Sequence, residues 1–197
     1  MRRTEQQRLD AGEGDLMAPH LHFSPELLLK AQDLSVVFFD VDGVMTDGAL
    51  YFTEEGETLK RFHVLDGYGM VMLQRVGIVP AVVTGRDAKA LRLRLQALGI
   101  EHVRFGATDK VAGAQSILDS LGKQWHQAAA MGDDWPDLPL LRRCALAVAP
   151  PNAHAEVLAV VDHITLHCGG QGAVRDLCDL LLVARGRYAS MLDEAGG

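Results

Sequence analysis

Residues 36–48 constrain the fold of this 197-residue chain more than any other stretch. The apolar residues 36–39 have the β-branched and aromatic character of a buried strand and run directly into Asp40 and Asp42. The Asp-Gly pair at 42–43 is typical of a turn, so the strand should end at Asp40. Ligands of open α/β sheets bind beyond the carboxyl ends of the strands. We therefore expect a site here, with Asp40 as a nucleophile toward phosphorus and Asp42 as its acid/base partner.

Strand and helix patterns alternate along the rest of the chain. Strands that alternate with helices predict an α/β fold, a three-layer Rossmann-like parallel sheet with helices on both faces. The first strand is expected at residues 34–39, and the later strands at residues 78–83, 102–105, 128–131, 145–149 and 163–166. The expected helices are residues 25–31, 66–76, 86–98, 110–121, 136–142, 153–160 and 173–185.

An insertion interrupts this alternation between the first strand and its helix. Two β-forming runs flank a short turn that contains Gly56, which predicts a β-hairpin over residues 49–64. The length allows one domain with a substantial core, which we place at residues 23–187. Residues 1–22 are polar and should form a flexible N-terminal tail, and residues 188–197 a C-terminal tail.

Composition and charge narrow the functional classes. A formal net charge of −7 argues against nucleic-acid binding, which needs a basic face, and no apolar run is long enough to span a membrane. Arg2 and Arg3 are not followed by an apolar stretch, so we expect no signal peptide. The cysteines, Cys144, Cys168 and Cys178, form no Cys-x-x-Cys motif and suit a reducing compartment. The sequence thus predicts a cytoplasmic protein.

Four groups of polar residues each follow a predicted strand, so a parallel sheet should gather them along one edge. Carboxylates such as Asp40 and Asp133 are hard ligands suited to Mg²⁺, Thr84 offers a hydroxyl donor, and Lys110 a positive charge for phosphate. Phosphoryl transfer needs little beyond placement and charge neutralisation, and an attacking aspartate gives an aspartyl-phosphate. The four groups are Asp40 with Asp42, Thr84-Gly85-Arg86, Lys110, and Asp133-Asp134 with Asp137.

Each group taken singly has a plainer interpretation. The Asp-x-Asp-Gly stretch could be a turn or a calcium loop, although an EF-hand is excluded because Met45 and Tyr51 occupy its glycine and glutamate positions. Thr84 with Gly85 could cap a helix, Lys110 could be a solvated charge, and the later aspartates could favour a helix N-terminus. The order and strand-end placement of all four groups favour the catalytic interpretation.

These four motifs resemble, in order, those of the haloacid dehalogenase superfamily, over about residues 30–190. Residues 41–48, 66–69 and 169–175 are further similar to its capless tetrameric phosphatases of sugar-acid biosynthesis. The resemblance implies that the hairpin stands in place of a cap domain and builds the intersubunit barrel of a homotetramer. It also implies that the glycine-rich residues 169–172 close over a neighbour's active site.

The same resemblance implies a role for each site residue. Mg²⁺ would be held by the Asp40 carboxylate, the Asp42 main-chain carbonyl and Asp133, and Asp42 would protonate the leaving sugar oxygen and later activate water. Asp134 and Asp137 would contact the metal ligands and not the metal ion itself. Arg86 and Arg94, eight residues apart and so near one helix face, would favour the sugar-acid carboxylate, with solvated charge as the alternative. The implied substrate-binding residues are Thr84, Gly85, Arg86, Arg94 and Lys110.

The implied activity is Mg²⁺-dependent hydrolysis of 3-deoxy-D-manno-octulosonate 8-phosphate, a step in lipopolysaccharide precursor biosynthesis. Leu65 departs from the arginine of such phosphatases, which bears on substrate preference. Two alternatives remain: a phosphatase of a nonulosonate (sialic-acid-like) 9-phosphate, and a non-catalytic tetramerisation module of the same fold. The intact acidic set with Lys110 argues against the second.

Overall fold

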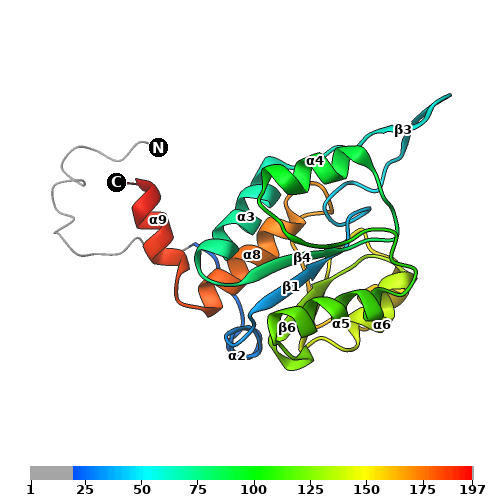
Figure 1. Cartoon of the computed structure of the whole chain (residues 1–197). Helices are drawn as coiled ribbons and strands as arrows, with labels where there is room; N and C mark the ends of the chain where they lie inside the picture. Colours follow the sequence, from blue (N-terminus) through cyan, green and yellow to red (C-terminus); the bar gives the residue numbers. More distant parts are fainter. Residues whose placement is uncertain (1–19, 197) are drawn as a thin grey trace.

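The structure, a computed structural model, describes residues 20–196, so most of the predicted N-terminal tail lies outside the described residues. Its centre is a six-stranded sheet in the order β5-β4-β1-β6-β7-β8, and all neighbouring strands are parallel (Figure 1). The predicted parallel α/β sheet is confirmed. The strands are β1 (Val36–Phe39), β4 (Val79–Val83), β5 (His102–Arg104), β6 (Ala128–Met131), β7 (Leu146–Ala149) and β8 (His163–Ile164).

Helices cover both faces of the sheet and enclose two hydrophobic cores (Figure 1). Successive strand side chains point to opposite faces, so Val37 and Phe39 enter one core while Val36 and Phe38 enter the other. The first core lies under α2 (Pro25–Ala31), α3 (Val64–Arg75), α4 (Lys89–Ala97) and α8 (Ala173–Ala184). The second lies under α5 (Lys110–Leu121), α6 (Leu138–Leu141) and α7 (Ala155–Leu158).

Helix α5 begins and ends where the sequence predicts. The Asp109 side chain accepts a hydrogen bond from the Ala112 amide at 3.0 Å, which satisfies one of the free donors of the first turn. Gly122 ends the helix with φ 63°, a left-handed conformation that glycine adopts without strain. These two ends fix Lys110 in the first turn, beside the carboxyl edge of the sheet.

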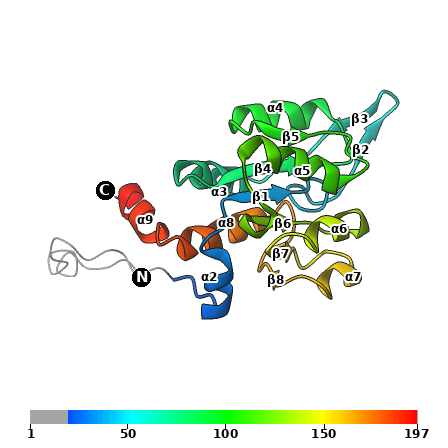
Figure 2. The ribbon, with the colours of Figure 1, turned by 60° about the horizontal axis from the view of Figure 1, so that its bottom comes forward.

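The inserted hairpin is also confirmed. Strands β2 (Tyr51–Thr53) and β3 (Gly56–Leu59) pair antiparallel, with a tighter turn than predicted because Thr53 already pairs with Gly56. The hairpin projects away from the sheet, at the opposite end of the molecule from the C-terminal helix (Figure 2). Its apolar side chains are unusually exposed, Phe52 at 64% and Leu59 at 53%.

Helix α4 begins at Lys89, three residues later than predicted. The Thr84 side chain accepts a hydrogen bond from the Arg86 amide at 3.2 Å, and Ala88 is extended, so residues 84–88 form a loop that bends at Gly85. Arg86 therefore precedes the helix. The prediction that Arg86 and Arg94 share a helix face is wrong.

Residues 188–196, predicted as part of a tail, form helix α9 (Tyr188–Gly196). Met191 is buried on the α3–α8 core, and Arg75 of α3 forms an ion pair with Glu194 at 2.7 Å. The helix is separated from α8 by Gly186 at φ 68°. Across residues 20–196, every helix is too short or too polar to span a bilayer, and the three cysteines are free.

Candidate active site

The carboxyl end of β1 holds Asp40 rigidly. Its amide continues the sheet ladder by donating to the Met131 carbonyl of β6 at 3.0 Å, and its side chain is only 10% exposed. The chain then turns sharply, since the Val41 carbonyl accepts from the amides of Met45 at 2.9 Å and Thr46 at 3.0 Å. Asp42 lies in this turn, with its side chain 21% exposed.

Lys110 reaches across from α5 to the same point. Its ammonium donates to Asp40 Oδ1 at 2.7 Å and to Asp137 Oδ1 at 2.6 Å, and all three side chains are nearly buried. Burial opposes the ammonium charge, but the two carboxylates outweigh it and raise the pKa of Lys110. Lys110 is therefore charged and faces the carboxylate predicted to attack phosphorus.

The carboxylates nevertheless outnumber this cation. Oxygen atoms of Asp40, Asp133 and Asp137 lie within 4.8 Å of one another. Burial, reinforced by Asp137, raises the pKa of Asp40 to about 6. Burial, reinforced by Asp40 and Asp137, raises the pKa of Asp133 to about 7. A hard divalent cation would offset this repulsion, so the site's chemistry fits Mg²⁺.

Asp137 supports this cluster from behind. Its Oδ1 accepts from Lys110, and its Oδ2 accepts from the amides of Asp133 at 3.1 Å and Asp134 at 3.3 Å. Both of its oxygens are thus engaged in orienting neighbours. Asp40 and Asp133 are the carboxylates better placed to hold a cation.

Gly43 permits the approach of Asp133 to the turn after β1. A Cβ atom at this position would lie 2.0 Å from Asp133 Oδ2, and the backbone has φ 92°. Both the close approach and the backbone conformation require glycine. The Asp-Gly pair, which the sequence predicts as a turn, thus also makes room for a candidate metal ligand.

The phosphate side of the site follows β4. The Thr84 amide donates to the Arg104 carbonyl at 3.0 Å, and because its side-chain oxygen accepts from Arg86, the hydroxyl proton remains available to a ligand. A cavity of about 300 Å³ opens here. Every predicted site residue except Arg94 lines it, together with Pro136.

Arg94 lies elsewhere. Its guanidinium donates to the His63 carbonyl at 3.4 Å and lies against Gly67, at the start of α3. Within this chain, Arg94 therefore joins α4 to α3 and does not line the cavity.

The hairpin contributes two residues that the sequence analysis missed. The Lys60 ammonium, just after β3, donates to Asp42 Oδ1 and lies 2.7 Å from Glu57 Oε1. The Lys60 side chain is only 1% exposed. The sequence did offer an indication of their place in the site, because both residues belong to the insertion that directly follows the turn with Asp42.

The glycine-rich residues 169–172 pack beneath the turn after β1 of their own chain. The Gly170 amide donates to the Val44 carbonyl at 2.9 Å, and a Cβ on Gly169 would lie 1.8 Å from the Gly43 carbonyl oxygen. Asn152 bridges the two segments, accepting from the Gly169 amide at 2.8 Å and donating to the Gly43 carbonyl at 3.3 Å. Gly169 and Gly170 are buried by these contacts, whereas Gln171 is exposed, and closure of this segment over a neighbour's active site stays a prediction.

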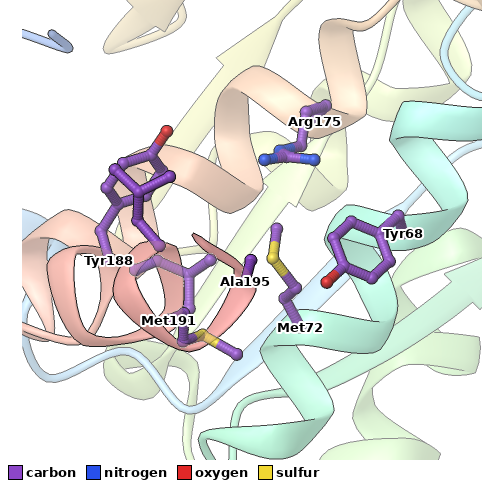
Figure 3. Close-up of a pocket in the computed structure, with 8 residues that line it drawn as sticks. Tyr68, Met72, Arg175, Tyr188, Met191 and Ala195 are labelled. Atoms are coloured by element: carbon purple, nitrogen blue, oxygen red, sulfur yellow. The ribbon is translucent and has the colours of Figure 1, made fainter. Parts of the chain in front are cut away.

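A second hollow lies between α3, α8 and α9, lined by Tyr68, Met72 and Met191 with the Arg175 guanidinium at its edge (Figure 3). Its volume is about 70 Å³, room for a few water molecules and far less than a sugar phosphate requires. Arg175 is also engaged by Asp179 at 2.7 Å. The carboxylate cavity is the better candidate active site.

An aspartate at a strand end, a lysine and further clustered aspartates on a parallel sheet are typical of haloacid dehalogenase-like hydrolases, and the model of that family matches residues 102–175. The chain is 40% identical over 174 residues to 3-deoxy-D-manno-octulosonate 8-phosphate phosphatase KdsC of Salmonella typhimurium. The match covers 88% of this chain and 90% of that protein. The chain therefore belongs to the KdsC family of phosphatases, as its motifs predict.

Solved structures of this family share the fold. The phosphatase of the same name from Yersinia pestis has 39% identity and a TM-score of 0.82, covering 84% of this chain and 90% of that one. The Moraxella catarrhalis phosphatase, in complex with a magnesium ion, a phosphate ion and KDO, has 34% identity and a TM-score of 0.85. That match covers 88% of this chain and 99% of that one.

Proposed function

We propose that this chain is a Mg²⁺-dependent phosphatase, with one catalytic domain at residues 23–187. It hydrolyses 3-deoxy-D-manno-octulosonate 8-phosphate to the free sugar acid and phosphate, in lipopolysaccharide precursor biosynthesis. The proposal rests on one observation above all: the cluster of Asp40, Lys110 and Asp133 lies in a chain 40% identical to KdsC.

The side chains divide the reaction between them. The Asp40 carboxylate forms an O–P bond while the ester O–P bond breaks, and Asp42 gives its proton to the leaving sugar oxygen. Lys110 and the Thr84 hydroxyl bind the transferring phosphoryl oxygens. Water then attacks phosphorus and gives a proton to Asp42, which restores Asp40 and releases phosphate.

Asp40, Asp133 and the Asp42 carbonyl would hold Mg²⁺, which supplies positive charge to the phosphoryl group and the attacking carboxylate when bound. Asp137 and Asp134 lie behind these ligands, and Arg86 at the cavity mouth would meet the sugar-acid carboxylate. Arg94 could contribute only by a route other than direct contact in this cavity, and its packing contact with His63 supports a structural role.

A substrate panel tests this proposal. With Mg²⁺ present, we expect phosphate release from 3-deoxy-D-manno-octulosonate 8-phosphate at a kcat/KM at least about tenfold above that for other sugar phosphates, since the site must match both ends of the substrate. A preference for a nonulosonate 9-phosphate would instead support the alternative phosphatase. Absence of release above that of an Asp40→Asn control would support the non-catalytic module.

We also propose that the hairpin assembles the chain into a homotetramer, because its exposed apolar side chains form a surface that a monomer rarely leaves uncovered. We expect light scattering to give the mass of four chains, and the Phe52→Asp variant to give a smaller mass. Leu166→Asp, the same kind of change on a residue 84% exposed outside the hairpin, is the matched control. A wild-type mass of one chain would refute the tetramer.

We propose that the chain binds neither nucleic acid nor a membrane, in line with the net charge of −7. The free thiols of Cys144, Cys168 and Cys178 support a reducing compartment, and we propose the cytoplasm.

A further inference from the structure

Lys60 is a buried cation to which the proposed phosphatase mechanism gives no role. Its side chain is 1% exposed, although it stands at the end of an exposed hairpin. Burying an ammonium costs several kcal/mol unless it is paired, as a rough figure. Lys60 is paired twice, with Asp42 Oδ1 and with Glu57 Oε1 at 2.7 Å.

Glu57 completes an alternating arrangement of charge. Its second oxygen, Oε2, lies 3.7 Å from one Arg86 nitrogen, and Asp42 Oδ2 lies 3.7 Å from another. The carboxylates of Asp42 and Glu57 thus alternate with the cations of Lys60 and Arg86. Glu57 balances the charge that Lys60 brings, so Lys60 can hold Asp42 without adding net positive charge beside it.

This arrangement decides how Asp42 is oriented. Asp42 lies in a turn rather than on a strand, where a short side chain has several staggered conformations open to it. Lys60 binds Oδ1, and Oδ2 is left on the side of Arg86, beyond hydrogen-bond distance from it. Asp42 and Arg86 both line the cavity, so Oδ2, the oxygen that Lys60 leaves unbound, would be the one presented to a substrate.

We propose that Lys60 is a positioning residue for the proton transfer of Asp42, with Glu57 as its charge-balancing partner. The inference rests on the proposed function. The proton moves from Asp42 Oδ2 to the ester oxygen as the ester O–P bond breaks and the Asp40 O–P bond forms, and the electron pair of the broken bond stays on that oxygen. The hairpin would thereby set the acid/base step while leaving Asp40 and Lys110 untouched.

The competing explanation is that Lys60 only ties the hairpin to the core. The two explanations differ in how they depend on the leaving group. A sugar alkoxide needs a proton to leave, whereas p-nitrophenolate leaves without one. A positioning residue for the proton should matter for the first substrate only, and a purely structural residue should matter equally for both.

The experiment measures single-turnover release of the leaving group from the sugar-acid phosphate and from p-nitrophenyl phosphate. For Lys60→Met, we expect the ratio of the two rates to fall about 10- to 100-fold, in the range known for groups that orient catalytic residues. KM for the sugar-acid phosphate should change less than about threefold. Lys123→Met, at the far end of α5, is the matched control and should leave the ratio unchanged.

Circular dichroism checks that Lys60→Met is folded, and two more conservative variants keep the test informative if it is not. Lys60→Arg keeps the charge and should recover most of the ratio, and Glu57→Gln keeps Lys60 and should lower the ratio by a smaller factor. An unchanged ratio in Lys60→Met and Glu57→Gln overturns the inference. Failure of the wild type on the sugar-acid phosphate counts against the proposed function instead, and the ratio is then measured with any alkyl phosphate it accepts.

Discussion

The Asp40→Asn variant should lose at least about 10³-fold in kcat on the sugar-acid phosphate, because an amide cannot attack phosphorus and removal of a nucleophile typically costs that much or more. At saturating Mg²⁺ the substrate would still bind, so the loss should fall on kcat more than on KM. Phosphate release under saturating substrate measures it. Asp33→Asn, the same change before the opposite end of β1, should retain wild-type activity.

The same variant should fold at least as well as the wild type. Burial and Asp137 raise the folded pKa of Asp40 to about 6, so this carboxylate favours folding at low pH and loses that contribution as pH rises through about 6. At pH 8 without metal the ionised Asp40 destabilises the fold, and the amide removes this cost. We expect a Tm equal to the wild type or a few degrees higher in EDTA. Near-normal turnover by a folded Asp40→Asn protein would reject Asp40 as the nucleophile.

The Asp133→Asn variant should lose about 10²- to 10⁴-fold in kcat/KM, since a bound cation contributes several kcal/mol of charge stabilisation to the transition state. The Mg²⁺ concentration for half-maximal activity should rise by at least about tenfold, because an amide oxygen carries no charge. A titration of activity with Mg²⁺ measures both quantities. Asp119→Asn, on the exposed surface of α5, serves as the control.

The pH dependence of Mg²⁺ activation gives this variant a second, independent readout. The pKa of Asp133 is about 7 without metal, so protons compete with Mg²⁺ as pH falls below that value. In the wild type, the half-activating concentration should rise up to about tenfold per pH unit below 7. In Asp133→Asn this rise should shift to below about pH 6, where Asp40 titrates. A profile identical to the wild type would exclude Asp133 as a ligand.

Much of the sheet follows from sequence alone because its strands are buried on both faces. The strands predicted at residues 34–39 and 128–131 are largely apolar. Strand β6 has the predicted bounds, and β1 begins two residues later than predicted, at Val36. The start of α4 was harder to predict because the pattern of leucines does not record the turn that Thr84 forms with Arg86. Helix α9 was missed although Tyr188, Met191, Leu192 and Ala195 have helical spacing, because a short terminal helix depends on tertiary contacts with α3 and α8.

The site was predictable where a residue acts from the end of a strand. Asp40, Thr84 and Asp133 converge because parallel strands share one carboxyl edge, a property of topology that sequence order reveals. Lys60 and Glu57 come from the insertion, and no periodic pattern in the sequence shows where the insertion lies relative to the sheet. Arg94 shows the converse: the family resemblance suggested a ligand contact, and the structure places its guanidinium against the His63 carbonyl instead of in the cavity.

The contact of Gly43 with Gly169 and Asn152 has a consequence for the synthesis of this protein. The turn that carries Asp42 is closed by a segment more than 100 residues later in the chain, and a Cβ at either glycine would break the fit. A nascent chain on the ribosome can pair β1 with β4 early, yet the turn after β1 lacks these supports until Gly170 has emerged. The turn therefore gains these supports only after residues 152–170 have been synthesised, and we expect truncation before this segment to abolish activity even where the sheet survives.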